Sequence, residues 1–480
     1  MKDGVVWRLL RTTGLIWALV RLCASAEPKV PFCRKGHGAA VAHFGAQGYQ
    51  MLVFGGKGHD WRIASKGTVF LSDLWALQME LDDDLDSVAT FHWTQLKPPG
   101  AIPVSRWKMA MSGANSSRAV AVMGGDHHQS AKVNRNDTWF YWPALNRWQP
   151  LHAIGEQPKP RRAHIALETP SGLLVHGGKF SGKQCLADVR ILTVEYDAQG
   201  ISSDVAPSWR AGASFPDKCR WGAAAALLRI GEDTRLAQQG DRYAIEKAVG
   251  NGTATVMALF GGRRVRKDDA YHYYDDLWFY YLEEDRWELG NPDRGARPQA
   301  RDHHSMNYVA DTKTLYVFGG RLAESAEASS VLNDLWAIPL REVTVDGHVR
   351  VQAGSWQRIE AASSIPQSRF LHTGSVWYGP NGTSDGALVI FGGEHIKKSG
   401  GNPKLNDAWL YLPSKQIWTV ISVNGCNAGD DGYPRGLSIS MSLFEAFAAV
   451  ILVAGISWLV CQQWAHRREY SPIEDEDEEF

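Results

Sequence analysis

A pair of adjacent glycines recurs six times along this chain, each time at the end of a run of apolar residues. In residues 315–320, for example, Leu-Tyr-Val-Phe leads directly into Gly319 and Gly320. Glycine tolerates φ > 0 and lets backbone or a large side chain come close, so each pair predicts a buried strand that stops where another segment packs against it. The pairs are Gly55 and Gly56, Gly124 and Gly125, Gly177 and Gly178, Gly261 and Gly262, Gly319 and Gly320, and Gly392 and Gly393.

Other residue types keep a fixed place around each pair: an arginine upstream, an aspartate downstream, and then two tryptophans. The arginines are Arg34, Arg106, Arg161, Arg220, Arg301 and Arg369. The aspartates are Asp73, Asp137, Asp188, Asp276, Asp334 and Asp407. Two residues later stand Trp75, Trp139, Trp278, Trp336 and Trp409, with Arg190 in the third copy. The second tryptophans are Trp93, Trp148, Trp209, Trp287, Trp356 and Trp418.

The spacing and content of the copies predict the fold. The glycine pairs lie about 53 to 84 residues apart, a range typical of propeller blades with loop insertions. Each copy offers four apolar or β-branched runs, and a lone four-stranded sheet cannot bury both faces, so the copies must stack on one another. Radial stacking leaves only short, protected edges. The predicted fold is therefore all-β, a β-propeller with six blades.

The glycine pair with its downstream tryptophan resembles the repeat of the kelch family, and the resemblance covers residues 33–421. It implies a six-bladed kelch-type β-propeller in which the glycine and tryptophan positions are structural. It says little about activity, because one fold serves many functions.

The two ends differ in composition from the repeats. Residues 1–26 have the basic start, apolar middle and small-residue close of a secretory signal peptide, the alternative being an uncleaved anchor. Residues 441–461 are almost wholly apolar and long enough to span a bilayer as one helix, and Arg467 and Arg468 after them place the C-terminal end in the cytosol. We therefore expect a single-pass type I protein of the plasma membrane or the endosomal/secretory pathway. Its propeller would be extracellular or lumenal, its stalk would be 422–440 and its cytosolic acidic tail 462–480.

Cysteine usage agrees with an oxidising compartment. Apart from one cysteine in the signal segment and one in the span, four remain. Because each blade is built from consecutive strands, no strand is expected to close the ring, and a Cys33–Cys426 disulfide would close it covalently. Cys185 would then pair with Cys219. The other two connectivities, and free buried thiols, remain alternatives.

Four Asn-x-Ser/Thr sequons predict N-glycosylation in such a compartment. The one in the second copy is the least favourable, because it adjoins the repeat aspartate. The acceptors are Asn115, Asn136, Asn251 and Asn381.

The connections just after the glycine pairs are rich in lysine and arginine. In a propeller they gather on one rim, and their formal charges sum to +8 on a chain of net charge −1. A basic rim attracts anionic partners, so acidic protein segments and anionic glycans are the expected ligands, and nucleic acid is not expected outside the cell. The alternative is a set of ordinary solvated loops. The candidate binding residues are Lys57, Arg62, Arg263, Arg264, Arg266, Lys397 and Lys398.

Four histidines stand three residues after the repeat arginine: His37, His164, His304 and His372. Recurrence at one repeat position favours blade packing over metal binding, so neither a metal nor a cofactor is expected. The sequence has no nucleophile elbow, phosphate loop or His-Glu-x-x-His motif. We expect a protein without catalytic activity, the alternative being a membrane-tethered enzyme with its site at the propeller mouth.

In the tail, Tyr470 and Ile473 form a pattern similar to the tyrosine-based sorting signals that clathrin adaptors read; the alternative is a passive, solubilising tail. The sequence thus predicts a membrane-anchored binding module for a protein or an anionic glycan, in adhesion, as a receptor or in cargo sorting. A chaperone-like partner of another membrane protein is a third hypothesis.

Overall fold

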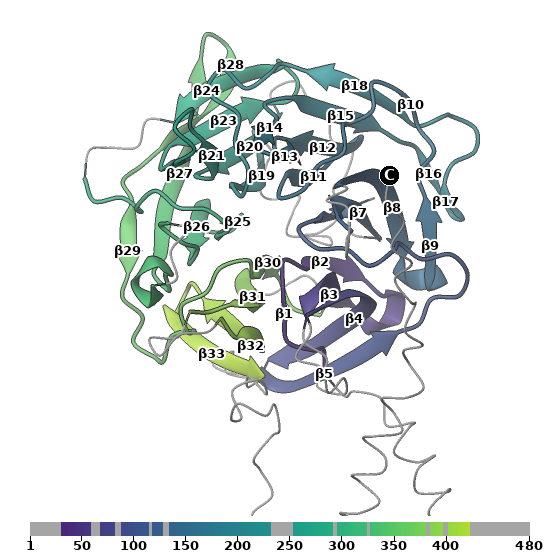
Figure 1. The fold of residues 1–480 in the computed structure, drawn as a ribbon, viewed down its shortest axis with the longest axis horizontal. Coiled ribbons are helices and arrows are strands. Elements are labelled where there is room, and N and C mark those ends of the chain that lie inside the picture. The colour runs from purple at the N-terminus through teal and green to yellow at the C-terminus, as the bar shows by residue number, and fades with distance from the viewer. Residues whose placement is uncertain are drawn as a thin grey trace, which may run out of the picture.

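The computed structural model describes residues 30–58, 68–81, 88–114, 118–127, 134–231, 253–290, 295–323, 327–380, 385–396 and 402–422. Its regular structure there consists of β-strands and short 3₁₀ turns, arranged around a common centre (Figure 1). The all-β prediction is confirmed. Within these residues no helix is long and apolar enough to span a bilayer. The predicted signal peptide, stalk, membrane span and tail lie outside them.

Each glycine-pair copy forms antiparallel strands that run outward from the centre of the ring (Figure 1). The first three copies contain β2 (Gly38–His43), β3 (Tyr49–Gly58), β4 (Val69–Leu81) and β5 (Val88–Leu96); β6 (Ala110–Ala114), β7 (Ala119–Asp126), β8 (Asn134–Trp142) and β9 (Arg147–Pro150); and β11 (Ile165–Thr169), β12 (Gly172–His176), β15 (Val189–Thr193) and β18 (Ser208–Gly212).

The later copies follow the same plan. They contain β19 (Ala224–Ile230), β20 (Ala254–Phe260), β23 (Leu277–Tyr281) and β24 (Arg286–Gly290); β25 (Ser305–Val309), β26 (Thr314–Phe318), β27 (Leu335–Val345) and β29 (Gln357–Ile359); and β30 (Thr373–Trp377), β31 (Ala387–Glu394), β32 (Lys404–Leu412) and β33 (Ile417–Ser422).

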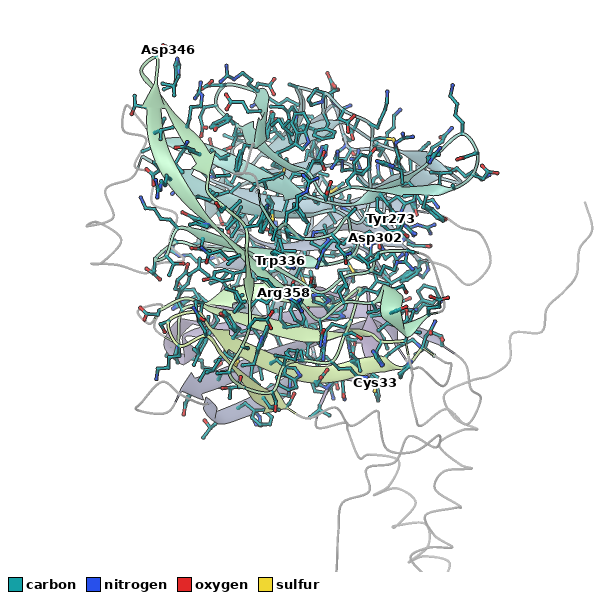
Figure 2. The ribbon with its side chains drawn as sticks, turned by 90° about the vertical axis from the view of Figure 1, so that its left-hand side faces the viewer. Cys33, Tyr273, Asp302, Trp336, Asp346 and Arg358 are labelled. Carbon is teal, nitrogen blue, oxygen red and sulfur yellow. A yellow bond between two sulfur atoms is a disulfide. The ribbon has the colours of Figure 1, made fainter. Side chains whose placement is uncertain are left out.

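Short strands, a hairpin and 3₁₀ turns add to the four strands of each copy. The β27–β28 hairpin carries Asp346 at its tip and projects from the body (Figure 2). The remaining elements are β1 (Arg34–Lys35), β10 (Ile154–Gly155), β13 (Lys179–Ser181), β14 (Gln184–Cys185), β16 (Tyr196–Asp197), β17 (Gly200–Ile201), β21 (Arg263–Val265), β22 (Tyr271–Tyr273), β28 (His348–Ala353), and the 3₁₀ turns η1 (Gly45–Gln47), η2 (Pro143–Leu145) and η3 (Ala328–Ser330).

The apolar core lies between neighbouring copies. In β26, Leu315 and Val317 belong to a cluster shared with β20 of the preceding copy, whereas Tyr316 and Phe318 belong to a cluster shared with β31 of the following copy. A strand buried on both faces needs apolar residues at every position, which explains the continuous apolar run before the glycine pair. The copies therefore stabilise one another by stacking.

The first and last copies are joined by β1. Arg34 pairs with Gly58 of β3 and with Leu405 of β32, so both copies belong to one sheet. The Asn406 side chain adds a 3.1 Å hydrogen bond to the carbonyl of Pro31. The expectation that no strand bridges the two ends is thereby corrected: a short strand does so through backbone hydrogen bonds.

Candidate functional site

The repeated arginine, aspartate, tryptophan and first glycine form one hydrogen-bonded group. In the fifth copy Arg301 donates two hydrogen bonds to Asp334, at 2.7 and 2.9 Å, and one to the carbonyl of Gly319 at 3.0 Å. Trp336 Nε1 donates to the same carboxylate at 2.7 Å. In the third copy Arg190 replaces the tryptophan and lies 3.5 Å from Asp188. The repeat pattern is therefore a structural network inside each copy.

This network buries charge. The Arg301 side chain is fully buried, and that of Asp334 is 14% exposed. Burial by itself would raise the pKa of Asp334, but the hydrogen bonds and charge of Arg301, together with Trp336, lower that pKa below its usual value. The ionised pair is the stable form.

The repeat histidines lie between the glycine pairs of adjacent copies. A Cβ added at Gly320 would be 2.8 Å from Cβ of His304, and one added at Gly261 would be 2.8 Å from Cε1 of the same ring. Gly320 also has a φ of +94°, so both sterics and backbone conformation require glycine there. These histidines have the packing role that their repeat position suggested.

A closed ring of backbone hydrogen bonds surrounds the centre. Each residue two places after a repeat arginine donates its amide hydrogen to the carbonyl of its counterpart in the preceding copy, over 2.6 to 3.0 Å. These residues have φ values from +50° to +67°. Among the described residues the ring consists of Gly36, Lys108, Ala163, Gly222, His303 and Leu371. The ring thus connects every copy to the next.

One face of the ring carries two further sets of residues, which pair with one another through backbone β-bridges. The residue after each repeat arginine pairs with the residue after each glycine pair. The pairs are Lys35 with Lys57, Trp107 with Asp126, Arg162 with Lys179, Trp221 with Arg263, Asp302 with Arg321, and Phe370 with Glu394. In the first set, charged residues alternate with aromatic residues around the ring.

We define the basic mouth as the seven cationic and three acidic side chains that surround the channel on this face. They are Lys35, Lys57, Lys108, Arg162, Lys179, Arg263, Arg321, Asp126, Asp302 and Glu394. The aromatic residues support them. Nζ of Lys57 and of Lys108 lie 5.2 and 4.6 Å from the ring of Trp107, and Lys179 and Arg263 lie 5.1 and 5.5 Å from that of Trp221. Such contacts hold cations in place without neutralising them.

Asp302 is the most deeply buried of the three carboxylates of the basic mouth. Its two oxygens lie 2.8 Å from Nε of Arg263 and 2.9 Å from Nε of Arg321, and the residue is fully buried. Elsewhere in the basic mouth Arg162 pairs with Asp126, and Lys35 pairs with Glu394. Among the described residues of the basic mouth the cationic groups outnumber the acidic ones, so this set of residues carries an excess of positive charge.

Lys108 is the cation of the basic mouth that lines the channel itself. In the described part of the chain no carboxylate pairs with it, and its partner is the Trp107 ring. Burial, followed by the charges of Arg321 and Arg263, lowers the pKa of Lys108 well below its usual value, although Asp302 acts in the opposite direction.

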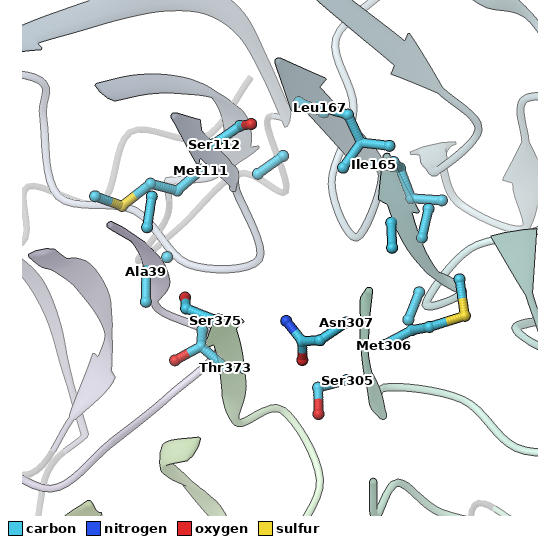
Figure 3. Close-up of a pocket in the computed structure, with 18 of the residues that line it drawn as sticks. Ala39, Met111, Ser112, Ile165, Leu167, Ser305, Met306, Asn307, Thr373 and Ser375 are labelled. Atoms are coloured by element: carbon cyan, nitrogen blue, oxygen red, sulfur yellow. The ribbon is translucent and has the colours of Figure 1, made fainter. Parts of the chain in front are cut away.

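Behind the basic mouth lies a central cavity of about 490 Å³, lined by β2, β6, β11, β19, β25 and β30. Figure 3 shows polar side chains from β25 and β30, among them Ser305, Asn307 and Ser375, on one side. On another side lie apolar side chains from β6 and β11, including Met111 and Ile165. The cavity can therefore accept a ligand with both polar and apolar parts.

Comparison with known proteins identifies the repeat. The KLHDC2/KLHL20/DRC7 Kelch-repeats domain model matches residues 7–211 and 242–436. The chain belongs to the kelch family.

Three curated proteins are similar to parts of this kelch chain. Host cell factor of Drosophila melanogaster is 25% identical over 313 residues, which are 62% of this chain and 16% of that protein. Dynein regulatory complex subunit 7 of Chlamydomonas reinhardtii is 27% identical over 142 residues, 30% of this chain and 10% of that protein. Rho GTPase-activating protein gacHH of Dictyostelium discoideum is 28% identical over 114 residues, which are 23% of this chain and 7% of that protein. The chain spans at most 16% of the length of these relatives.

Of the predicted binding residues, the structure brings Lys57 and Arg263 to the basic mouth. Arg264 donates from Nε to the hydroxyl of Tyr274 at 2.8 Å, and Arg266 is exposed and pairs with Asp268. Three others, Arg62, Lys397 and Lys398, lie outside the described residues.

Sequence reasoning missed five cationic members of the basic mouth: Lys35, Lys108, Arg162, Lys179 and Arg321. It assigned the rim to the connections after the glycine pairs, which include Lys179 and Arg321, without singling those two residues out. The segments just after the repeat arginines lie on the same face of the ring as those connections. The charge of the first two residues after each repeat arginine is the signal that would have found the other three.

The remaining predicted residues lie partly inside and partly outside the described part of the chain. Cys185 and Cys219 form a disulfide, with Cα atoms 5.5 Å apart. Cys33 is disulfide-bonded, whereas Cys426 lies outside the described residues. Asn136 is exposed, and its side-chain nitrogen donates to the carbonyl of Pro158 at 3.3 Å. The other three predicted glycosylation sites and the tail sorting pattern lie outside the described residues. These are Asn115, Asn251 and Asn381, and Tyr470 with Ile473. Within the described residues no group of three or more His, Cys, Asp or Glu side chains is arranged to hold a metal ion.

Proposed function

We propose that this kelch chain is a binding module with six blades that receives an acidic protein segment, or an anionic glycan, at the basic mouth. The observation that carries the proposal is the excess of cations held on aromatic rings around the opening of a cavity. An excess of oriented cations favours anionic partners, both by steering and by charge-assisted hydrogen bonds. The backbone ring that links every copy to the next supports the count of six blades and provides a rigid frame for the site.

We further propose that the domain is not a catalyst. The histidines most suited to acid–base chemistry at a repeat position are packed between glycine pairs, where burial lowers their pKa. Carboxylates such as Asp334 and Asp302 are committed to arginines.

The membrane topology stays a proposal that the sequence supports. The apolar segment at 441–461 would hold the domain on an extracellular or lumenal membrane surface, and Tyr470 with Ile473 would give a clathrin adaptor a sorting signal. The disulfide between Cys185 and Cys219 supports an oxidising compartment.

The proposed site can be tested with model polyanions. Full-length protein is titrated with fluorescent poly-L-glutamate and, separately, with heparin at several salt concentrations. The double variant Lys57→Gln/Lys179→Gln removes two cations of the basic mouth, and Lys313→Gln/Lys415→Gln removes the same charge from strand connections of the opposite face. We expect about tenfold weaker binding in the first variant and little change in the second. Equal losses in both would show non-specific attraction and would overturn the proposal.

A further inference from the structure

The β21–β22 hairpin of the fourth copy lies beside the basic mouth. Its register pairs Arg263 with Tyr273, and Val265 with Tyr271. Residues directly opposite one another in an antiparallel pair, and residues two apart along a strand, share one face, so these four side chains lie on the same face of the hairpin. That face adjoins the basic mouth, because Arg263 is one of its members and pairs through its backbone with Trp221.

Three aromatic rings surround the guanidinium group of Arg263. Its central carbon lies 4.2 Å from the ring centroid of Tyr271, 5.5 Å from that of Trp221 and 5.8 Å from that of Tyr273. Arg263 also donates a 3.1 Å hydrogen bond to the Tyr273 hydroxyl, and the rings of Trp221 and Tyr271 meet edge to face at 6.2 Å. These contacts hold the rings in place, so little side-chain freedom is left to lose on binding. We call Trp221, Tyr271 and Tyr273 the aromatic patch.

Tyr271 is the part of the aromatic patch that a partner can reach. Its exposed fraction is 37%, whereas Trp221 is buried and Tyr273 is half-buried. Among the Phe, Tyr and Trp side chains in the described part of the chain, the other exposed one is Phe91 on β5. An exposed tyrosine that is fixed against an arginine and a tryptophan has the composition of the hot spots that dominate protein interfaces.

We propose that the aromatic patch binds an aromatic side chain of the acidic protein segment that occupies the basic mouth. Lys179 lies 5.1 Å from the ring of Trp221, so this one ring stands between Lys179 and Tyr271. An extended chain advances about 3.3 Å per residue, and an acidic residue two or three positions from the aromatic one would therefore reach Lys179. The cations then steer the segment, and the aromatic patch selects it. The inference rests on the proposed function and favours its protein partner over its glycan partner.

The test uses fluorescently labelled octaglutamate peptides in which phenylalanine replaces one glutamate at each position in turn. The series samples every spacing between the aromatic residue and its acidic neighbours. Full-length protein is titrated with each peptide and with unsubstituted octaglutamate that carries the same label. We expect at least one phenylalanine peptide to bind about tenfold more tightly than octaglutamate, because ring contacts add to the attraction between charges. The absence of a gain at every position would overturn the inference without any variant.

Three variants assign the gain to the aromatic patch. The quantity compared is the ratio of the affinities for the best phenylalanine peptide and for octaglutamate, so a general change in charge attraction cancels. Tyr271→Ala should lower this ratio from about tenfold to less than about twofold, whereas Tyr271→Phe keeps the ring and should keep the ratio. Phe91→Ala removes the other exposed aromatic side chain and should also leave the ratio unchanged. An undiminished ratio in Tyr271→Ala would overturn the inference.

A second measurement on the wild-type protein does not depend on the folding of any variant. Photoreactive benzoylphenylalanine takes the place of phenylalanine in the best peptide, and its cross-links are mapped by mass spectrometry. We expect them at Trp221 and in residues 263–273, and cross-links confined to other parts of the chain would contradict the inference.

The failures of the inference and of the proposed function differ. If octaglutamate binding is weakened by Lys57→Gln/Lys179→Gln but phenylalanine adds nothing at any position, only the role of the aromatic patch is overturned. If neither octaglutamate nor any phenylalanine peptide binds, the proposed protein partner is overturned together with it.

Discussion

At the scale of single residues, the strongest constraint is the buried ion pair that every copy repeats. Arg34, Arg161, Arg301 and Arg369 have fully buried side chains, and each donates two hydrogen bonds to the aspartate of its own copy. A buried charge is tolerated when its donors are satisfied. Here the carbonyl of the first glycine accepts a further hydrogen bond from the same guanidinium group. The pair therefore fixes the strand connection after each glycine pair.

Asp334→Asn should be strongly destabilising, because it leaves the Arg301 guanidinium buried without its counter-charge. We expect a loss of about 3–5 kcal/mol in the free energy of unfolding, measured by urea denaturation. The control is Glu360→Gln, since Glu360 pairs with Arg358 at 3.3 Å while both side chains are mostly exposed. It should cost less than about 1 kcal/mol. Similar losses in the two variants would contradict a special role for the repeat pair.

The packed histidines predict loss of stability in acid. Burial, followed by the charge of Arg301, lowers the pKa of His304 to about 3. Between that value and the ordinary value of about 6.5, the unfolded chain binds a proton that the folded chain does not, so stability falls as pH falls through this window. Each such histidine contributes up to about 1.4 kcal/mol per pH unit.

His304→Met should reduce this acid dependence by about one proton, measured from the free energy of unfolding between pH 4 and 7. Methionine fits the position, because Met109 occupies it in the second copy, where its side chain lies against Gly55 and Gly125. His152→Gln alters an exposed histidine and serves as the control. An unchanged slope in the methionine variant would refute the assignment.

At the scale of elements, the sequence predicted the frame better than its additions. The apolar runs before the glycine pairs correspond to β3, β7, β12, β20, β26 and β31, because burial on both faces leaves a continuous apolar signal. The β27–β28 hairpin was not predicted, since no repeat residue marks it. It is held by Arg350, which donates at 2.7 and 2.9 Å to Glu284 of the neighbouring copy.

The Cys185–Cys219 disulfide should stabilise the junction between the third and fourth copies. Cys185 ends the β13–β14 hairpin, and Cys219 directly precedes Arg220, with a sequence separation of 34 residues. For a loop of that length the chain-entropy model gives about 3–4 kcal/mol. Cys185→Ser/Cys219→Ser should therefore lower the free energy of unfolding by that amount in urea denaturation. A variant as stable as the wild type would show that stacking alone holds the junction.

At the scale of the whole molecule, the repeat predicted closed radial stacking but not how the ends join. The backbone of Arg34 pairs with both β3 and β32. The place of Arg34 as the first repeat arginine indicates its aspartate partner but carries no local signal for that backbone pairing. The basic mouth was predicted only in part for a similar reason. Loop charges can be counted along the chain, whereas the meeting of Lys108 with arginines of three other copies is a property of the closed ring.

If partners bind on the face of the basic mouth, cross-linking mass spectrometry will locate them there, whichever proteins those partners are. Full-length protein in its native extract is treated with an amine-reactive cross-linker, and the lysines joined to other proteins are mapped. We predict that partner cross-links concentrate at Lys35, Lys57 and Lys179 and are lost when salt is raised before cross-linking. Partner cross-links concentrated instead at Lys313 and Lys415, on the opposite face, would contradict binding at the basic mouth.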